Sequence, residues 1–376
     1  MPERHLHIIS FDVPFPANYG GVIDVYYKLE ALKKAGVKVH LHCFDYGRGK
    51  AIVLDELCET VNYYLRQTGL KANLSTLPYI VNSRKSELLI DNLLKDDYPI
   101  LFEGLHSCFY LDDPRLKNRF KIYRESNIEH HYYYHLFRDE KNGFKKIFFA
   151  IESLRLKNYQ KVLNHADLML VVSHSDTDYL RKQFPEKKVE CLPSFHPNDD
   201  FTVIPGTGDY VLYHGKLSVT ENYKAAEYLV KNIFSKTTHK LVVAGMDPPQ
   251  QLQDMCANHQ NVELNQNPED GEMFALIQNA QANILITFQP TGLKLKLLNT
   301  LYKGRFCIVN PEMVQGTGLE ELCEVGENDQ QLIQKINEVI KREFDMAEIE
   351  QRKKLLSKNY SNLLNAGRLK GLVFDK

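Results

Sequence analysis

The sequence predicts an α/β protein built from two doubly wound domains that face each other across a cleft. Short apolar runs rich in β-branched residues alternate with helical patterns along the whole chain, as in parallel sheets covered by helices. A polar segment at 193–208, rich in Pro and Gly, interrupts this alternation. The 376 residues exceed one ordinary core and suffice for two. We therefore expect domains at 1–197 and 198–345, and helices at 346–376 that pack back toward the first domain.

The composition is that of a globular protein, with 43% hydrophobic and 25% charged residues. The formal net charge of -1 argues against nucleic acid as a partner. Seven cysteines without a Cys-x-x-Cys pair indicate reduced thiols rather than disulfides or a zinc site, and hence a cytoplasmic protein. No segment approaches the roughly 18 apolar residues of a spanning helix, so any membrane contact should be peripheral.

The chain begins with a βαβ pattern. It comprises a strand at 5–11, a loop rich in Pro and Gly at 12–21, a helix at 22–35 and an alternating strand at 37–44. Gly20 and Gly21 lie between the first strand and the helix, where a parallel sheet can offer backbone amides to a ligand. The alternative is a tight turn that needs positive φ.

The next elements lead to a polar and aromatic cluster at 124–135. We expect helices at 54–68 and 86–95 and strands at 100–102 and 120–123. Asn127, Glu129 and His130 would then project from the carboxyl edge of a strand, where open α/β sheets build sites. Alternatively, Ser126 or Asn127 caps a helix whose tyrosines pack inward. The histidines of the cluster lack a spaced set of other ligands, so we expect no metal.

An amphipathic helix is predicted at 144–156. From 141 to 164 the sequence has six basic residues and one acidic residue, a local net charge of +5. We expect the apolar stripe of this helix to pack on the core and the lysines to face water. A surface of this charge could also meet an acidic lipid surface or a phosphorylated acceptor.

The second half repeats the alternation. Its predicted elements are strands at 210–213, 240–245, 282–288 and 306–309, and helices from 222, at 271–279 and from 291–293 onward. The last of these helices carries one stripe of leucines and should end at Gly304. Lys294 and Lys296 fall in its first turns, where cations are disfavoured unless an anion such as a diphosphate binds there. The alternative is two solvated lysines on a surface helix.

Six segments together resemble the GT-B glycosyltransferases, particularly retaining glycosyltransferase family 4 and its family 1 style relatives. In chain order they are PANYGG (16–21), RESNIEH (124–130), ADLMLVVS (166–173), VECLP (189–193), HGKLS (214–218) with Asn222, and TGLKLKLLN (291–299). The resemblance covers the whole chain and implies a GT-B fold. It departs from the family at Asn299 and Thr291, where relatives carry glutamates, and at Ser126, where they carry a histidine.

The resemblance also implies site residues. The catalytic set would be Lys216, Lys296 and His130, and Asn127 and Glu129 would lie on the acceptor side. The donor-binding set would be Gly20, Gly21, Gly215, Asn222, Gly245, Thr291, Gly292, Leu293, Lys294 and Asn299. Enzymes of this fold work without a bound metal, so lysines would stabilise the charge on the departing diphosphate.

The expected function is a retaining hexosyltransferase without a cofactor, with a nucleoside-diphosphate sugar as co-substrate and a glycan or lipid-linked acceptor. It would be cytoplasmic, with peripheral contact at the inner membrane face as an option. Two alternatives remain open. One is a catalytically altered GT-B protein that binds a glycan or a partner, and the other is a nucleotide-sugar 2-epimerase, which needs carboxylates for proton abstraction.

Overall fold

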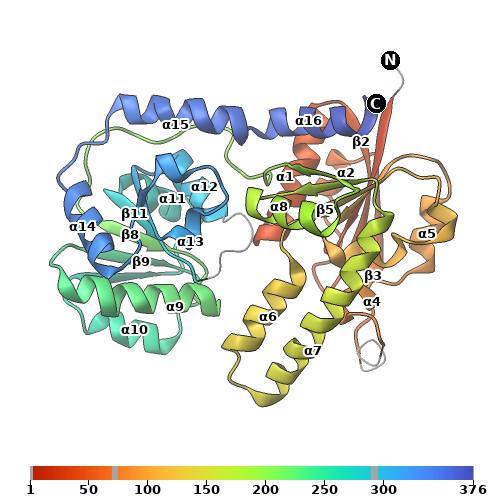
Figure 1. The fold of residues 1–376 in the computed structure, drawn as a ribbon. Coiled ribbons are helices and arrows are strands. Elements are labelled where there is room, and N and C mark those ends of the chain that lie inside the picture. The colour runs from red at the N-terminus through yellow and green to blue at the C-terminus, as the bar shows by residue number, and fades with distance from the viewer. Residues whose placement is uncertain (1–2, 70–74, 289–294, 376) are drawn as a thin grey trace. The chain divides into compact units, whose positions relative to one another are not determined.

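The computed structural model describes residues 3–69, 75–288 and 295–375, which form two compact units (Figure 1). We call residues 3–197 with 359–375 the N-terminal unit, and residues 198–288 with 295–358 the C-terminal unit. In the described part of the chain, no helix combines the length and the apolar composition that crossing a membrane requires.

The N-terminal unit contains a seven-stranded parallel sheet of order β3-β2-β1-β4-β5-β6-β7. The strands are β1 (Arg4–Ser10), β2 (Val37–Asp45), β3 (Thr60–Leu65), β4 (Ile100–Glu103), β5 (Lys121–Glu125), β6 (Leu168–Val171) and β7 (Lys188–Cys191). In the centre of the sheet, Ile8 pairs with Leu41 on one side and Leu101 on the other. Alternate residues of β1 serve the two core layers, because Ile8 packs in one cluster and Ile9 in the other.

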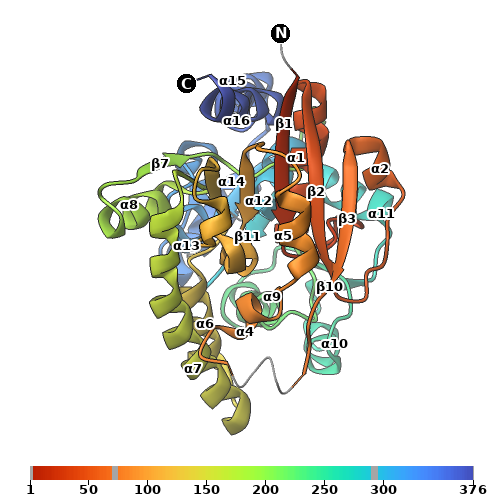
Figure 2. The same ribbon diagram turned by 90° about the vertical axis from the view of Figure 1, so that its right-hand side faces the viewer.

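Helices cover both faces of this sheet. They are α1 (Gly20–Lys34), α2 (Val53–Leu57), α4 (Tyr79–Asn82), α5 (Glu87–Leu93), α6 (Glu129–Asp139), α7 (Gly143–Tyr159), α8 (His174–Gln183) and α16 (Asn362–Phe374), with 3₁₀ turns η1 (Leu105–Tyr110), η2 (Pro114–Leu116) and η3 (Gln160–His165). Helix α16 packs beside α1, where the Lys370 ammonium donates to the Ala35 carbonyl at 2.6 Å. Helices α6 and α7 lie side by side and extend beyond the sheet (Figures 1 and 2).

The predicted helix at 54–68 is wrong. The structure has the short helix α2 there, followed by strand β3. The β3 sequence TVNYYL is rich in β-branched and aromatic residues, and it pairs in parallel with β2, for example Cys43 with Tyr63. This long-range pairing, rather than the spacing of local apolar residues, decides the structure of the segment.

A buried ionic cluster ties α1 to strands β4 and β5. The Lys28 ammonium donates to Asp24 at 2.9 Å and to Glu103 at 2.6 Å, and Arg124 approaches the same Asp24 at 3.2 Å. All four side chains are buried. Each charge is therefore compensated inside the core, which makes the loss of any one partner costly.

The C-terminal unit contains a six-stranded parallel sheet of order β10-β9-β8-β11-β12-β13. The strands are β8 (Val211–His214), β9 (Leu241–Gly245), β10 (Val262–Gln266), β11 (Ala282–Leu285), β12 (Phe306–Val309) and β13 (Glu324–Val325). The helices are α9 (Thr220–Tyr228), α10 (Gln250–Ala257), α11 (Asp270–Asn279), α12 (Leu295–Lys303), α13 (Pro311–Val314), α14 (Asp329–Val339) and α15 (Met346–Asn359), with short turns η4 (Leu229–Ile233), η5 (Phe234–Lys236) and η6 (Glu320–Leu322).

The units divide at Pro197 and again at Lys358. Helix α15 packs on the C-terminal unit, where the buried Arg352 guanidinium donates to the Gly304 carbonyl at 2.6 Å. Of the two helices after residue 345, it is α16 that belongs to the N-terminal unit.

Candidate functional site

Two glycines bring the ends of β8 and β9 together in the C-terminal unit. A Cβ added to Gly245 would lie 1.8 Å from the Gly215 carbonyl oxygen, and a Cβ on Gly215 would lie 3.1 Å from the Asn222 side chain. The Gly215 amide also donates to the Ala244 carbonyl at 3.1 Å. Glycine is therefore required at Gly245 for the two strand ends to approach this closely. This is the carboxyl edge of the sheet, where α/β folds bind ligands.

Asn222 joins the two predicted lysine segments at this edge. The Lys296 ammonium donates to the Asn222 side-chain oxygen at 3.1 Å, and the Asn222 amide donates to the Lys216 carbonyl at 3.0 Å. The Lys296 ammonium also lies 5.4 Å from the centre of the Tyr213 ring. Lys296 is half-buried and the Lys216 side chain is exposed. The structure thus brings the Lys296 side chain and the Lys216 backbone to one site, which we call the lysine site.

His214, the last residue of β8, lies behind the lysine site. It is buried and hydrogen-bonded to the Thr300 hydroxyl at 3.1 Å. Burial lowers the pKa of His214 to about 3, and the charges of Lys296 and Lys303 reinforce that shift. The imidazole is therefore neutral at pH 7 and adds no positive charge beside the lysines.

Asn299 lies one helical turn after Lys296 on α12, so both side chains share one face of the helix. Its side-chain oxygen is buried and has no hydrogen-bond partner among the described residues. A buried acceptor of this kind suits a donor group on a ligand. The predicted site residues Thr291, Gly292, Leu293 and Lys294 lie outside the described residues.

Glu221 was missed in the sequence. It lies in the first turn of α9, next to Asn222, and accepts a hydrogen bond from the Thr287 hydroxyl. The Thr287 amide in turn donates to Asn310 at 3.1 Å. A carboxylate is therefore present at this edge of the sheet, although it comes from α9 and not from α12, where the family pattern carries it.

In the N-terminal unit, Gly20 and Gly21 form the first turn of α1. Neither glycine has a positive φ, so the predicted alternative of a strained tight turn is wrong. A Cβ on Gly21 would lie 2.5 Å from the Phe11 ring, so this glycine makes room for Phe11. Tyr19 precedes the helix without a side-chain cap, which leaves the first-turn amides to other partners.

A buried carboxyl and a part-buried imidazole meet where β4 and β5 end. Glu129 opens α6 and is 5% exposed, and its carboxyl oxygen lies 3.8 Å from Nδ1 of His106 on η1. Burial raises the pKa of Glu129 to about 8, against the opposing charge of Arg84, and burial lowers the pKa of His106 well below its usual range. The contact therefore joins two neutral groups at pH 7 and is not an ion pair.

Arg84 and His106 were missed in the sequence because neither lies in a recognised motif. The Arg84 guanidinium is buried and donates to the Phe11 carbonyl at 2.8 Å, at the end of β1. Strands β1 and β4 are neighbours, so the fold brings Arg84, His106 and Glu129 to the same carboxyl edge. We call these three residues the Glu129 cluster.

Asn127 and Ser126 do not cap α6, so that part of the alternative interpretation is wrong. Ile128 occupies the cap position, and the backbone amide of Asn127 donates to the buried Glu125 carboxyl group at 3.1 Å. Burial, with the nearby Glu129 adding to it, raises the pKa of Glu125 well above its usual value. Tyr134 is 50% exposed, so the tyrosines of this helix do not all pack inward.

His130 lies apart from the contacts of Glu129. Its ring is within 3.4 Å of the Tyr179 hydroxyl and packs 4.3 Å from the His131 ring, centre to centre. Burial lowers the pKa of His130 to about 4. A neutral, nearly buried imidazole could accept a proton only from a group that reaches it directly.

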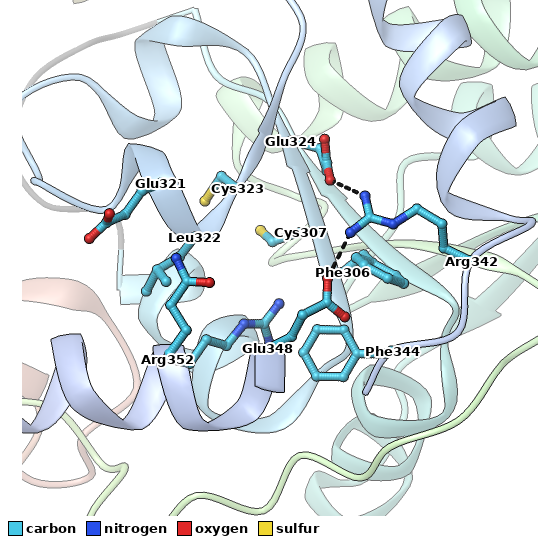
Figure 3. Close-up of a pocket in the computed structure, with 11 residues that line it drawn as sticks. Phe306, Cys307, Glu321, Leu322, Cys323, Glu324, Arg342, Phe344, Glu348 and Arg352 are labelled. Carbon is cyan, nitrogen blue, oxygen red and sulfur yellow. Dashed lines mark hydrogen bonds and ion pairs between the residues drawn. The ribbon is translucent and has the colours of Figure 1, made fainter. Parts of the chain in front are cut away.

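A separate cavity of about 180 Å³ lies between β12, β13 and α15 (Figure 3). Arg342 bridges Glu324 at 2.5 Å and Glu348 at 2.7 Å across this cavity. The thiols of the buried Cys307 and the part-buried Cys323 line it, and all seven cysteines of the chain are free. Arg342 is thus paired with two carboxylates of the cavity wall, which indicates a structural role for these three residues.

Comparison of the sequence with known proteins gives a relative but no family model. No family model matches the chain. An uncharacterized 44.6 kDa protein in the cps region of Klebsiella pneumoniae is 28% identical over 336 residues, covering 83% of this chain and 84% of the relative.

Solved structures align over nearly the whole chain. Sucrose-phosphate synthase from Thermosynechococcus elongatus has a TM-score of 0.69 at 15% identity, covering 98% of both chains. WaaG, a glycosyltransferase involved in lipopolysaccharide biosynthesis, has a TM-score of 0.65 at 12% sequence identity, and the alignment covers 99% of this chain and 100% of WaaG. Anabaena HepE in complex with UDP and glucose has a TM-score of 0.62 at 11% sequence identity, and the alignment covers 98% of both chains. The two parallel-sheet units of this protein thus have the GT-B glycosyltransferase fold that the sequence predicts.

Proposed function

We propose that this protein is a glycosyltransferase of polysaccharide biosynthesis, which moves a hexose from a nucleoside-diphosphate sugar to a saccharide or lipid-linked acceptor with retention of configuration. The GT-B fold and the relative from a cps region support glycosyl transfer. A lipid-linked acceptor would place the protein at the inner face of the membrane, as a cytoplasmic protein in peripheral contact.

The observation that carries the proposal is the lysine site. Lys296 is oriented by Asn222, which also binds the Lys216 backbone, at an edge where Gly215 and Gly245 keep the loops close. Positively charged donors aimed at a leaving diphosphate stabilise the charge that develops as its bond to the sugar breaks. In this proposal the lysines stabilise the charge of the leaving diphosphate without a metal.

The reaction follows from these parts. The acceptor oxygen bonds to the anomeric carbon on the face from which the diphosphate leaves, while the bond from that carbon to the phosphate oxygen breaks. The acceptor proton passes to the departing phosphate oxygen. The Glu129 cluster lies in the unit to which the acceptor is assigned, and a carboxyl that is protonated at pH 7 can donate a hydrogen bond to a sugar hydroxyl.

The test is a donor panel on the full chain. UDP-, GDP- and TDP-hexoses are incubated with and without lipid-linked and free saccharide acceptors, and both nucleotide release and glycosylated product are measured. Product with one donor, and its loss in Lys296→Met, would support the proposal. Stabilisation by a nucleotide without turnover would favour the binding protein instead, and a 2-epimer formed without acceptor would favour the epimerase.

A further inference from the structure

Helix α7 presents a stripe of large apolar side chains to solvent. Phe144, Ile147 and Leu154 are 89%, 61% and 64% exposed, and Phe148 and Ile151 between them are 36% and 45% exposed. Spacings of three and four residues place all five on one face of the helix. The expectation that this stripe packs on the core is therefore wrong.

The opposite face fixes the rotation of α7. Glu152 is fully buried, where it accepts from the Tyr79 amide at 2.7 Å and from Arg155 at 2.9 Å. The neighbouring Ser153 hydroxyl donates to the His130 carbonyl at 2.8 Å. Turning the helix to bury the stripe would break these bonds and expose the packed face, so the stripe is a fixed feature of the N-terminal unit.

The charged residues of the segment that carries the stripe are almost all positive. Residues 141–164 contain six basic residues and one acidic residue, and the acidic one is the buried Glu152. Five of the cations are lysines, Lys141, Lys145, Lys146, Lys157 and Lys161. Arg138 and Asp139 at the end of α6, with Glu140 after it, add one basic and two acidic residues, so the positive charge comes from residues 141–161.

We propose that the α6–α7 hairpin docks this protein on an anionic lipid bilayer, with the apolar stripe inserted among the acyl chains and the lysines on the lipid phosphates. An apolar face flanked by lysines fits an interfacial helix, and exposed tyrosines such as Tyr132 and Tyr134 on α6 suit the headgroup region. A protein partner fits less well, because protein interfaces are depleted in lysine. Membrane docking rests on the proposed function in one respect: its role would be to give the enzyme access to a lipid-linked acceptor.

The test is flotation of the full chain with vesicles, in the absence of any donor. Vesicles of phosphatidylcholine with about a third phosphatidylglycerol should carry the wild type, and pure phosphatidylcholine or ~0.5 M salt should weaken binding at least tenfold. The triple variant Phe144→Ser, Ile147→Ser, Leu154→Ser should lose at least tenfold. The control Ile52→Ser, Leu65→Ser removes two side chains that are 81% and 82% exposed elsewhere in the same unit, and it should bind like the wild type.

Three outcomes would overturn the inference. They are no binding to anionic vesicles, equal binding by the triple variant, and a wild-type dimer that the triple variant converts to a monomer, which would make the stripe a contact between copies. Donor turnover with a water-soluble acceptor should survive the triple substitution. Vesicle binding and transferase activity can therefore fail independently.

Discussion

Replacing Lys296 by methionine should lower kcat/KM for the donor at least tenfold. The ammonium is half-buried and is oriented by its hydrogen bond to Asn222. An ammonium about 4 Å from a phosphate oxygen contributes ~1 kcal/mol in water and ~4 kcal/mol at an effective dielectric constant of ~20. A loss of ~1.4 kcal/mol is already tenfold in rate. These limits correspond to losses of about fivefold and nearly a thousandfold, and a half-buried site falls between them, so a tenfold loss lies near the low end of the range.

The assay compares steady-state turnover of Lys296→Met with Lys296→Arg and Lys303→Met. Arginine keeps the charge and should restore part of the rate. Lys303 lies two turns further along α12, with its ammonium 5.5 Å from the centre of the Phe274 ring, so its loss controls for removing a cation from the same helix. Thermal unfolding establishes that all three variants fold.

An independent measurement reports on the same charge. Because Lys296 helps to hold the pKa of His214 at about 3, that pKa should rise in Lys296→Met when it is followed by NMR. Unchanged turnover in Lys296→Met, or an equal loss in the Lys303 variant, would refute the assignment of Lys296 to the leaving diphosphate.

Three further predictions test other parts of the molecule. Gly245→Ala should weaken nucleotide binding at least tenfold in calorimetry, because its Cβ would lie 1.8 Å from a carbonyl oxygen, whereas Gly271→Ala, with open space around it, should bind normally. The pKa of Glu129 is raised from 4.5 to about 8, so the stability that its proton contributes is complete below pH ~4.5 and is lost as the pH rises through about 8. In urea unfolding at pH ~5 and pH ~9, Glu129→Gln should abolish this loss, which is at most ~5 kcal/mol. Lys28→Met leaves two buried carboxylates without their shared cation and should lower Tm by about 10 °C, whereas the exposed Lys38→Met should change it by less than ~2 °C.

Local sequence patterns were sufficient to predict those elements whose apolar spacing and whose boundary residues indicate the same type of structure. Strand β1, helix α1 and strand β2 follow from alternation, helical spacing and the glycine that ends the helix. Strand β3 was missed because its leucine and tyrosine spacing also fits a helix, and only its pairing with β2 decides between the two. Element type is thus uncertain from sequence where long-range pairing supplies the deciding free energy.

The lysine site and the Glu129 cluster differ in the same way. Asn222 was named with the lysines because it accompanies the segment 214–218 in the resemblance to the GT-B family, and the structure supplies its bond to Lys296. The Glu129 cluster draws Arg84 and His106 from separate loops, which only the strand order β1-β4-β5 brings together. A single sequence holds no local signal for such a juxtaposition.

Helix α7 shows what periodicity leaves undetermined. The spacing of Phe144, Ile147 and Ile151 establishes that one face is apolar, but it does not say which face meets the core. Glu152 decides this, because its carboxylate is buried against the Tyr79 amide and Arg155, and leaving either bond unmade inside the protein would cost free energy. A polar residue with specific buried partners can therefore direct an apolar stripe outward, where only an apolar medium or another surface can cover it.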